Sequence, residues 1–223
     1  MRRVCILAPL ILLAVCGWAQ IEPPPKSEPH SPVLAPAPAS PKAEPWEYTL
    51  TVDGYIISGQ DGYAQPTFTA DHKWLHLEAR YNYENFRTGS LWAGYNFSWG
   101  KTWRFAVSPM IGGVFGRTNG IAPGCEASVS WKMFDLSLDN EYVFDTTSKS
   151  GNFYYAWPQF TITPIDWFKF GAVMQRTKTF KTTLNVQRGF FVGFMHKKLE
   201  FTTYVFDPGS NTTSVVLEVG ASF

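Results

Sequence analysis

The chain has 223 residues, of which 45% are hydrophobic, 17% aromatic and only 17% charged, and its formal net charge is +1. A charge this close to zero leaves no basic surface for nucleic acid, and three cysteines are too few for a disulfide scaffold. The apolar content is too high for a disordered chain.

Residues 1–19 have the three-part form of a secretory signal peptide. Arg2 and Arg3 precede an apolar run over residues 4–15, and Ala19 supplies the small side chain that a signal peptidase requires. The run is too short to span a bilayer as a helix. We therefore expect export followed by cleavage after Ala19.

The residues before Cys16 leave a second interpretation open. Residues 13–16 resemble a lipobox, in which the cysteine is acylated. Val15 is larger than the residue that usually precedes such a cysteine. Whether Cys16 carries a lipid is therefore left open by the sequence.

Residues 20–45 form a proline-rich segment with nine prolines between Pro23 and Pro45. Proline fixes φ and removes a backbone donor, so the segment favours polyproline II and builds no core. At about 3.1 Å per residue it reaches roughly 80 Å when extended. We expect a disordered tether. Contact with the cell wall or a partner is the alternative to a plain spacer.

From residue 46 onward the hydrophobic pattern repeats every two residues, and no stretch of ten residues shows helical periodicity. Residues 74–84 show the alternation most clearly. Their apolar positions are Leu75, Leu77, Ala79, Tyr81 and Tyr83, and their polar positions are His76, Glu78, Arg80, Asn82 and Glu84. Clusters of Gly, Asn, Asp, Ser and Lys separate such runs, which is typical of antiparallel strands and turns. The pattern predicts an all-β fold over residues 46–223.

We expect twelve strands, at residues 46–58, 62–70, 74–84, 89–99, 102–115, 124–132, 135–145, 152–163, 167–177, 183–195, 198–206 and 213–223. The second is the weakest, so ten strands are the alternative. Pro66, Pro109 and Pro158 fall inside strands, where proline cannot donate a ladder hydrogen bond. Each is expected to mark a bulge or a strand end.

Alternation alone does not say whether the apolar face fills a soluble sandwich or faces lipid. Tryptophan positions favour lipid, because six of these residues fall at one end of the predicted strands. They are Trp46, Trp74, Trp99, Trp103, Trp131 and Trp167. Indole combines an apolar ring with an N–H donor and is enriched at membrane interfaces. We predict an aromatic girdle at the periplasmic end of a membrane barrel.

The predicted connections differ in length between the two ends. Those at the tryptophan end are short, as at residues 100–101 and 133–134. Those at the opposite end are mostly longer and polar, as at residues 116–123, 146–151 and 207–212. Outer-membrane barrels show this asymmetry.

The last strand alternates as well. Its apolar face holds Val215, Leu217, Val219, Ala221 and Phe223, and its other face holds Glu218, Gly220 and Ser222. In this pattern, with a terminal Phe, the chain resembles bacterial outer-membrane β-barrel proteins. The resemblance implies an antiparallel up-and-down transmembrane β-barrel in the outer membrane, with its tether in the periplasm. It also implies insertion by the barrel-assembly machinery, with Phe223 as the assembly signal.

An outward apolar face places the polar positions inside the barrel. The predicted lumen and pore-lining residues are Asp53, His76, Glu78, Arg80, Arg104, Glu126, Lys132, Asp139, Glu141, Lys169, Glu200 and Glu218. Charges without partners or water cost several kcal/mol each when buried. These residues therefore either interlock and close the barrel or line a narrow hydrated channel. Their acidic excess favours cations or neutral polar solutes.

No catalytic, cofactor or metal site is predicted. His76 and Glu78 share a face and could form an acid–base pair, but an ion-pair ladder is the simpler interpretation. Four scattered histidines lack the convergent spacing of a metal site. Basic residues in the predicted outward loops could bind lipopolysaccharide phosphates or could simply be solvated; they are Arg87, Arg117, Lys149, Lys178 and Lys181.

The sequence thus predicts an outer-membrane β-barrel that acts as a narrow channel for passive diffusion of small polar solutes. A closed structural barrel, whose loops or tether bind a partner, is the alternative, and an outer-membrane enzyme is less favoured. The expected partners are membrane lipid, lipopolysaccharide, the assembly machinery and solute, but not nucleic acid. The identity of the solute and the oligomeric state stay open.

Overall fold

The computed structural model describes residues 45–223 except residues 58, 60 and 180–184, so the predicted signal peptide and all but the last residue of the predicted tether lie outside the described residues. The strands are β1 Glu47–Ile57, β2 Tyr63–His72, β3 Leu75–Tyr81, β4 Thr88–Tyr95, β5 Phe97–Trp99, β6 Arg104–Gly116, β7 Gly120–Trp131, β8 Phe134–Asp145, β9 Phe153–Ile165, β10 Phe168–Thr179, β11 Asn185–His196, β12 Leu199–Phe206 and β13 Ser214–Ser222. One 3₁₀ turn, Lys149–Gly151, precedes β9. Within the described part of the chain, no helix has the length and apolarity needed to cross a membrane.

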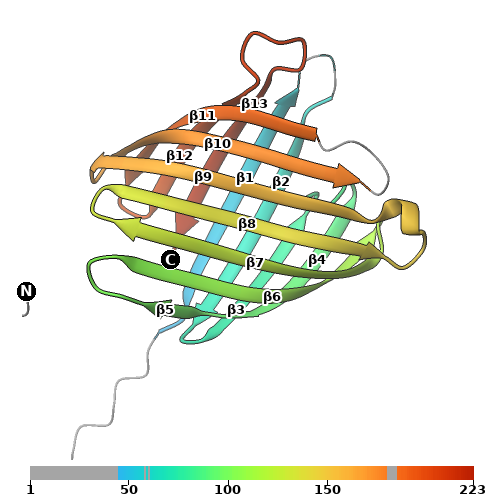
Figure 1. Cartoon of the computed structure of the whole chain (residues 1–223), viewed down its shortest axis with the longest axis horizontal. Coiled ribbons are helices and arrows are strands. Elements are labelled where there is room, and N and C mark those ends of the chain that lie inside the picture. Colours follow the sequence, from blue (N-terminus) through green and yellow to red (C-terminus); the bar gives the residue numbers. More distant parts are fainter. Residues whose placement is uncertain (1–44, 58, 60, 180–184) are drawn as a thin grey trace, which may run out of the picture. The chain divides into compact units, whose positions relative to one another are not determined.

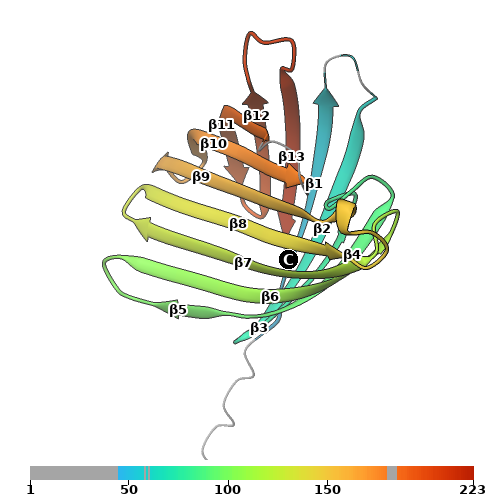
Figure 2. The same cartoon turned by 45° about the vertical axis from the view of Figure 1, so that its right-hand side comes forward.

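These strands form one antiparallel sheet that closes on itself. β1 pairs with β13, from Thr49 opposite Ser222 to Ile57 opposite Ser214, and the remaining ladders join strands that are neighbours or near neighbours in the chain. In Figure 1, β6 to β11 cross the front of the barrel and β1, β2 and β13 cross behind them; Figure 2 shows the same barrel turned by 45°.

β4 and β5 occupy a single strand position. Both pair with β6, and the register is the same on either side of the break: Gly94 lies opposite Met110, and Phe97 opposite Val107. Counted this way, the described strands form a closed barrel of twelve strands, which confirms the predicted fold and strand number.

The prolines interrupt ladders without displacing strands. Pro109 pairs in register with Cys125 of β7 and lies, on its other side, at the break between the β4–β6 and β5–β6 ladders. Pro66 and Pro158 also pair on one side and lie at the end or a break of the ladder on the other. Since the strands run through in unchanged register, the expectation of a bulge or strand end at each proline was wrong. A missing N–H removes single bonds, and the second ladder holds the strand in place.

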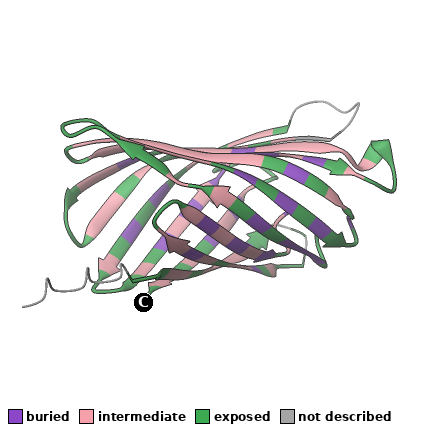
Figure 3. Ribbon diagram, turned by 90° about the horizontal axis from the view of Figure 1, so that it is seen from below, coloured by how far each residue is buried: buried purple, intermediate pink, exposed green. Residues whose placement is uncertain are grey.

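The two faces of the barrel wall are sorted in the way that the orientation prediction required. Large apolar side chains are exposed on the outside; Ile56, Leu91 and Ile111 each keep more than half of their surface accessible. Charged side chains such as Arg80 and Glu141 are buried inside. Figure 3 shows buried and exposed residues alternating along the strands, as a period of two requires.

The two ends of the barrel differ. At one, here named the turn end, the strands are joined at residues 73–74, 100–103, 132–133, 166–167 and 197–198. The other, the loop end, carries the connections 82–87, 146–152 and 207–213. Lys73, Lys132 and Lys197 have φ between 53° and 57°, which matches two-residue turns whose twist follows that of the flanking strands. Trp46, Trp74, Trp99, Trp103, Trp131 and Trp167 all lie at the turn end.

Two predicted boundaries were wrong at the loop end. β7 begins at Gly120, so the loop predicted at residues 116–123 shortens to residues 117–119 and Pro123 pairs with Ile111 inside the sheet. The strand predicted at residues 74–84 ends at Tyr81. Asn82 has φ 60° and turns the chain out of the ladder, a conformation that asparagine adopts more readily than most residues.

Apolar side chains also fill part of the interior toward the loop end, which the sequence did not predict. One cluster contains Tyr55, Val173, Phe191, Tyr204, Phe206 and Val216. The other contains Trp92, Met110, Val114, Ala122 and Val143. The interior therefore has a packed apolar zone near the loops and a charged zone below it.

Candidate functional site: the charged interior of the barrel

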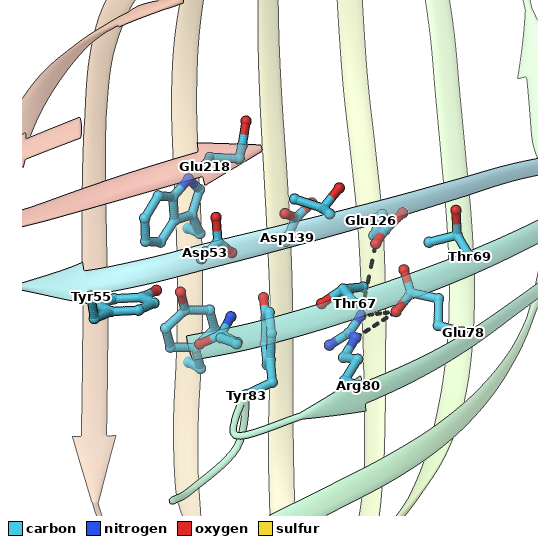
Figure 4. A pocket seen from close by; sticks show the side chains of 14 residues that line it. Asp53, Tyr55, Thr67, Thr69, Glu78, Arg80, Tyr83, Glu126, Asp139 and Glu218 are labelled. Carbon is cyan, nitrogen blue, oxygen red and sulfur yellow. Dashed lines mark hydrogen bonds and ion pairs between the residues drawn. The ribbon is translucent and has the colours of Figure 1, made fainter. Parts of the chain in front are cut away.

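Arg80 is the centre of the charged zone. The alternation of β3 points His76, Glu78 and Arg80 to the same inner face. The Arg80 guanidinium forms an ion pair with Glu78 on its own strand, and its Nη1 donates to Glu141 Oε2 of β8 at 3.0 Å. Its Nη2 lies 3.8 Å from Glu126 Oε1 of β7. Figure 4 shows the contacts of Arg80 with Glu78 and Glu126, which join the two sides of the barrel, as a planar guanidinium with several donors allows.

Aromatic rings cover the same guanidinium. The Arg80 Cζ atom lies 4.4 Å from the ring centroid of Tyr83 and 4.6 Å from that of Trp92, within cation–π range. Tyr83 in turn packs edge-on against Tyr155 of β9, with 5.5 Å between centroids. Glutamates and rings together leave Arg80 8% exposed, so it is held on all sides.

Tyr83 reaches this position because the loop 82–87 folds into the barrel. Glu84 is buried and accepts hydrogen bonds from Ser90 Oγ at 2.5 Å and from Trp92 Nε1 at 3.2 Å. Asn82 Nδ2 donates to the Ala64 carbonyl at 2.8 Å. These bonds fix Glu84 and its neighbour Tyr83 inside the barrel near the loop end, whereas Asn85, Phe86 and Arg87 stay exposed.

Two cavities lie along the charged zone. A central cavity of about 220 Å³ is lined by Asp53, Glu78, Arg80, Glu126, Asp139 and Glu218, among others. A second cavity of about 560 Å³ lies toward the turn end, where Asp71, His76, Asn96, Ser108 and Glu126 line it. Glu126 borders both. Arg80, Tyr83 and Tyr155 also line the central cavity, but the small gap that they form with Glu141 is too narrow for a water molecule.

A second polar group lies on the opposite wall. Lys169 of β10 pairs with Glu200 of β12, and Thr202 Oγ1 donates to the same carboxylate at 3.2 Å. Tyr204 Oη donates to Glu218 Oε2 at 3.1 Å. Asp53 lies directly opposite Glu218 in the β1–β13 ladder, so two carboxylates face the cavity side by side.

The predicted interior residues differ in where the structure places them. Asp53, Glu78, Arg80, Glu126, Asp139 and Glu218 border the central cavity, whereas Glu141 packs against Arg80 above it. His76 borders the turn-end cavity, and Lys169 and Glu200 form their own pair. Arg104 is exposed at the turn end of β6. Lys132 lies in the β7–β8 turn with its Nζ 4.7 Å from the Trp131 ring, and so takes no part in the interior cluster.

Sequence reasoning missed Tyr83, Glu84 and Trp92 as parts of the site. Glu84 stood on the polar face of the alternating run, but the loop that buries it breaks the period at Asn82. Tyr83 stood on the face assigned to lipid, and the same turn directs it inward. Asn82 was the available signal, because asparagine favours the left-handed conformation that ends a strand.

The deep interior is acidic. Its carboxylates are Asp53, Glu78, Glu84, Glu126, Asp139, Glu141, Glu200 and Glu218, whereas Arg80 and Lys169 are the permanently charged cations found among them in the described residues. A low-dielectric wall strengthens the resulting field inside the lumen.

No protein-family model and no curated protein sequence matches this chain. Among solved structures, the KdgM porin matches with 13% identity and a TM-score of 0.58, covering 78% of this chain and 99% of that one. The NanC porin matches with 13% identity and a TM-score of 0.52, covering 78% and 98%. A further KdgM structure matches equally well and is described as a complex with disordered oligogalacturonate. The predicted resemblance to outer-membrane β-barrel proteins is thus confirmed at the level of fold, and the chain has the barrel fold of these porins.

Proposed function

We propose that this protein is a narrow outer-membrane channel for passive diffusion of small polar solutes, with a preference for cations and neutral molecules over anions. The observation that carries the proposal is the sorting of the wall: apolar side chains outside, and a charged zone with two cavities inside. A soluble barrel would reverse that sorting. Passage requires binding that is weak enough for release, and no chemical step.

The membrane setting follows from the outer surface. The exposed apolar side chains suit acyl chains, and the tryptophans at the turn end suit the periplasmic interface. In this proposal the tether at residues 20–45 lies in the periplasm, and the assembly machinery reads the last strand with Phe223. Arg87, Arg117, Lys149, Lys178 and Lys181 are candidates for contact with lipopolysaccharide; Lys181 and the side chain of Lys178 lie outside the described residues.

The solute class follows from the negative charge of the side chains that line the lumen. Oligogalacturonate, present in one KdgM structure, is a polyanion because each uronate unit carries a carboxylate. The acidic interior of the present barrel repels such a solute, especially where Asp53 and Glu218 stand side by side. We therefore assign it solutes of the opposite charge or of no charge.

The size class follows from the constriction. The gap between Arg80, Tyr83, Glu141 and Tyr155 is too narrow for water, and the cavity beside it holds only about 220 Å³. This packing also favours a second candidate, a closed structural barrel whose loops or tether make the functional contact. In that case the ion pairs serve stability alone.

Planar-bilayer recording separates the two. Full-length protein, shown to be folded by heat-modifiable migration, is reconstituted under a KCl gradient. A small single-channel conductance with a reversal potential of cation-selective sign supports the channel. Folded protein that yields no channel refutes it and favours the closed barrel, for which capture of a partner should depend on residues 20–45.

A further inference from the structure

Three side chains at the boundary of the two cavities converge on one point. His76 and Glu78 project from the same face of β3, and Glu126 projects from β7 on the opposite side of the lumen. One nitrogen or oxygen ligand atom from each lies within 4.8 Å of the other two. In a tetrahedral zinc site, bonds of about 2.1 Å separate ligand atoms by about 3.4 Å. Small rotations of the two glutamates close that difference.

His76 is held in the orientation that a metal ligand requires. Its Nδ1 lies 2.8 Å from Asp71 Oδ1, and because a carboxylate only accepts, Nδ1 carries the proton. Asn96 Nδ2 donates to the same Asp71 oxygen at 2.6 Å and fixes the carboxylate. When the imidazole is neutral, its lone pair is therefore on Nε2, the nitrogen that lies 3.2 Å from Glu78 Oε1. A carboxylate behind a histidine in this way orients metal ligands in many sites.

His76 is only 5% exposed, and its Nε2 has no hydrogen-bond partner among the described residues. It lies 3.2 Å from Glu78 Oε1 but makes no hydrogen bond to it. A buried polar atom without a partner costs about 1–3 kcal/mol of stability. A bound ligand at Nε2 would remove that cost. The atom is directed at the point where the glutamates meet.

The charge at this point also calls for a cation. Arg80 binds Glu78 through Oε2, which leaves Oε1 directed toward His76. The same guanidinium is 3.8 Å from Glu126 and is already engaged by Glu141. One permanent positive charge thus serves three carboxylates, with Asp71 a fourth behind the histidine. A divalent cation between His76, Glu78 and Glu126 would restore the balance.

We propose that His76, Glu78 and Glu126 bind a divalent transition-metal ion, with Asp71 as the positioning residue behind His76. An imidazole with two carboxylates suits Zn²⁺ better than Mg²⁺, which prefers oxygen ligands in octahedral geometry. The turn-end cavity of about 560 Å³, which His76 and Glu126 line, supplies an entry path and room for a water ligand. The site stands on this geometry alone and is independent of whether the barrel conducts.

The test is calorimetric titration of ZnCl₂ into folded, chelator-treated full-length protein in detergent micelles. We expect one Zn²⁺ per chain at this site and at least a tenfold loss of affinity in His76→Gln. Asp71→Asn should weaken binding by about 10–100-fold, because its effect passes through the histidine. Millimolar Mg²⁺ should not displace the zinc.

His196→Gln is the matched control, since His196 is an exposed histidine at the same end of the barrel. It should bind Zn²⁺ as the unmodified chain does. Glu126→Gln is the second ligand variant, because Glu126 is only partly buried and its loss should leave folding intact, as heat-modifiable migration would show. If the folded protein binds no Zn²⁺, or if the His76 and Glu126 variants bind it as tightly as the control, the site does not exist.

Discussion

Replacing Arg80 by Met tests whether the interior cluster holds the barrel together. The side chains of Glu78 and Glu141 are each 3% exposed, and both pair with this guanidinium. Glu141 Oε1 already lacks a hydrogen-bond partner among the described residues, so the variant would strip its carboxylate of the bond at Oε2 as well. Removing one partner of a buried ion pair costs about 3–5 kcal/mol, because the remaining charge has neither solvent nor partner. We expect Arg80→Met to lower the free energy of unfolding by that amount.

The assay is urea-induced unfolding of the protein in lipid vesicles, followed by tryptophan fluorescence and by heat-modifiable migration. Lys169→Met is the matched control: its partner Glu200 keeps 34% of its side chain exposed and also accepts from Thr202 Oγ1, so its cost should be smaller than that of Arg80→Met. Adding Glu78→Gln and Glu141→Gln to Arg80→Met should recover much of the loss, because the uncompensated charges disappear. An Arg80→Met variant as stable as the Lys169→Met control would refute the reasoning.

Three further predictions concern the lumen and the outer wall. Tyr83→Ala removes a ring from the constriction beside Tyr155 and should raise single-channel conductance; an unchanged conductance would show that the narrowest point lies elsewhere. Glu126→Gln with Asp139→Asn removes two cavity carboxylates and should move the reversal potential under a KCl gradient toward zero, whereas a shift toward stronger cation selectivity would contradict an acidic filter. Ile111→Arg places a charge on the exposed outer face and should cost about 2–4 kcal/mol in vesicles if that face lies at the bilayer midplane, and nearly nothing if water bathes it.

The wall of the barrel was predictable from sequence because each strand carries its own period of two. The alternation of residues 75–81 assigns His76, Glu78 and Arg80 to one face whatever the strand pairs with, and the structure buries all three. Strand number followed from turn residues between such runs, which act locally.

The lumen was less predictable, because its content depends on contacts between distant strands. Alternation assigns Phe191 and Phe206 to one face of their strands. It does not predict that apolar side chains of other strands, such as Tyr55, pack against them inside the barrel. The inward loop depends on the left-handed conformation of Asn82 and on the bonds that Glu84 finds with Ser90 and Trp92. These contacts form where the alternating pattern has already ended, so a period of two does not predict them.

The ladder between β1 and β13 has a consequence for the order of assembly. Nearly all other ladders described here form between chain neighbours as hairpins, whereas this seam joins the two extremes of the barrel sequence, with Tyr48 and Phe223 exchanging backbone hydrogen bonds. Closing so long a loop carries the largest entropic cost of any pairing in the sheet. We therefore expect β1 and β13 to pair last. Until it does, the molecule is an open ribbon with two unsatisfied edges, which hydrocarbon does not tolerate and which invite pairing with another chain. Shielding both edges until they meet would therefore favour closure of the barrel over pairing with another chain.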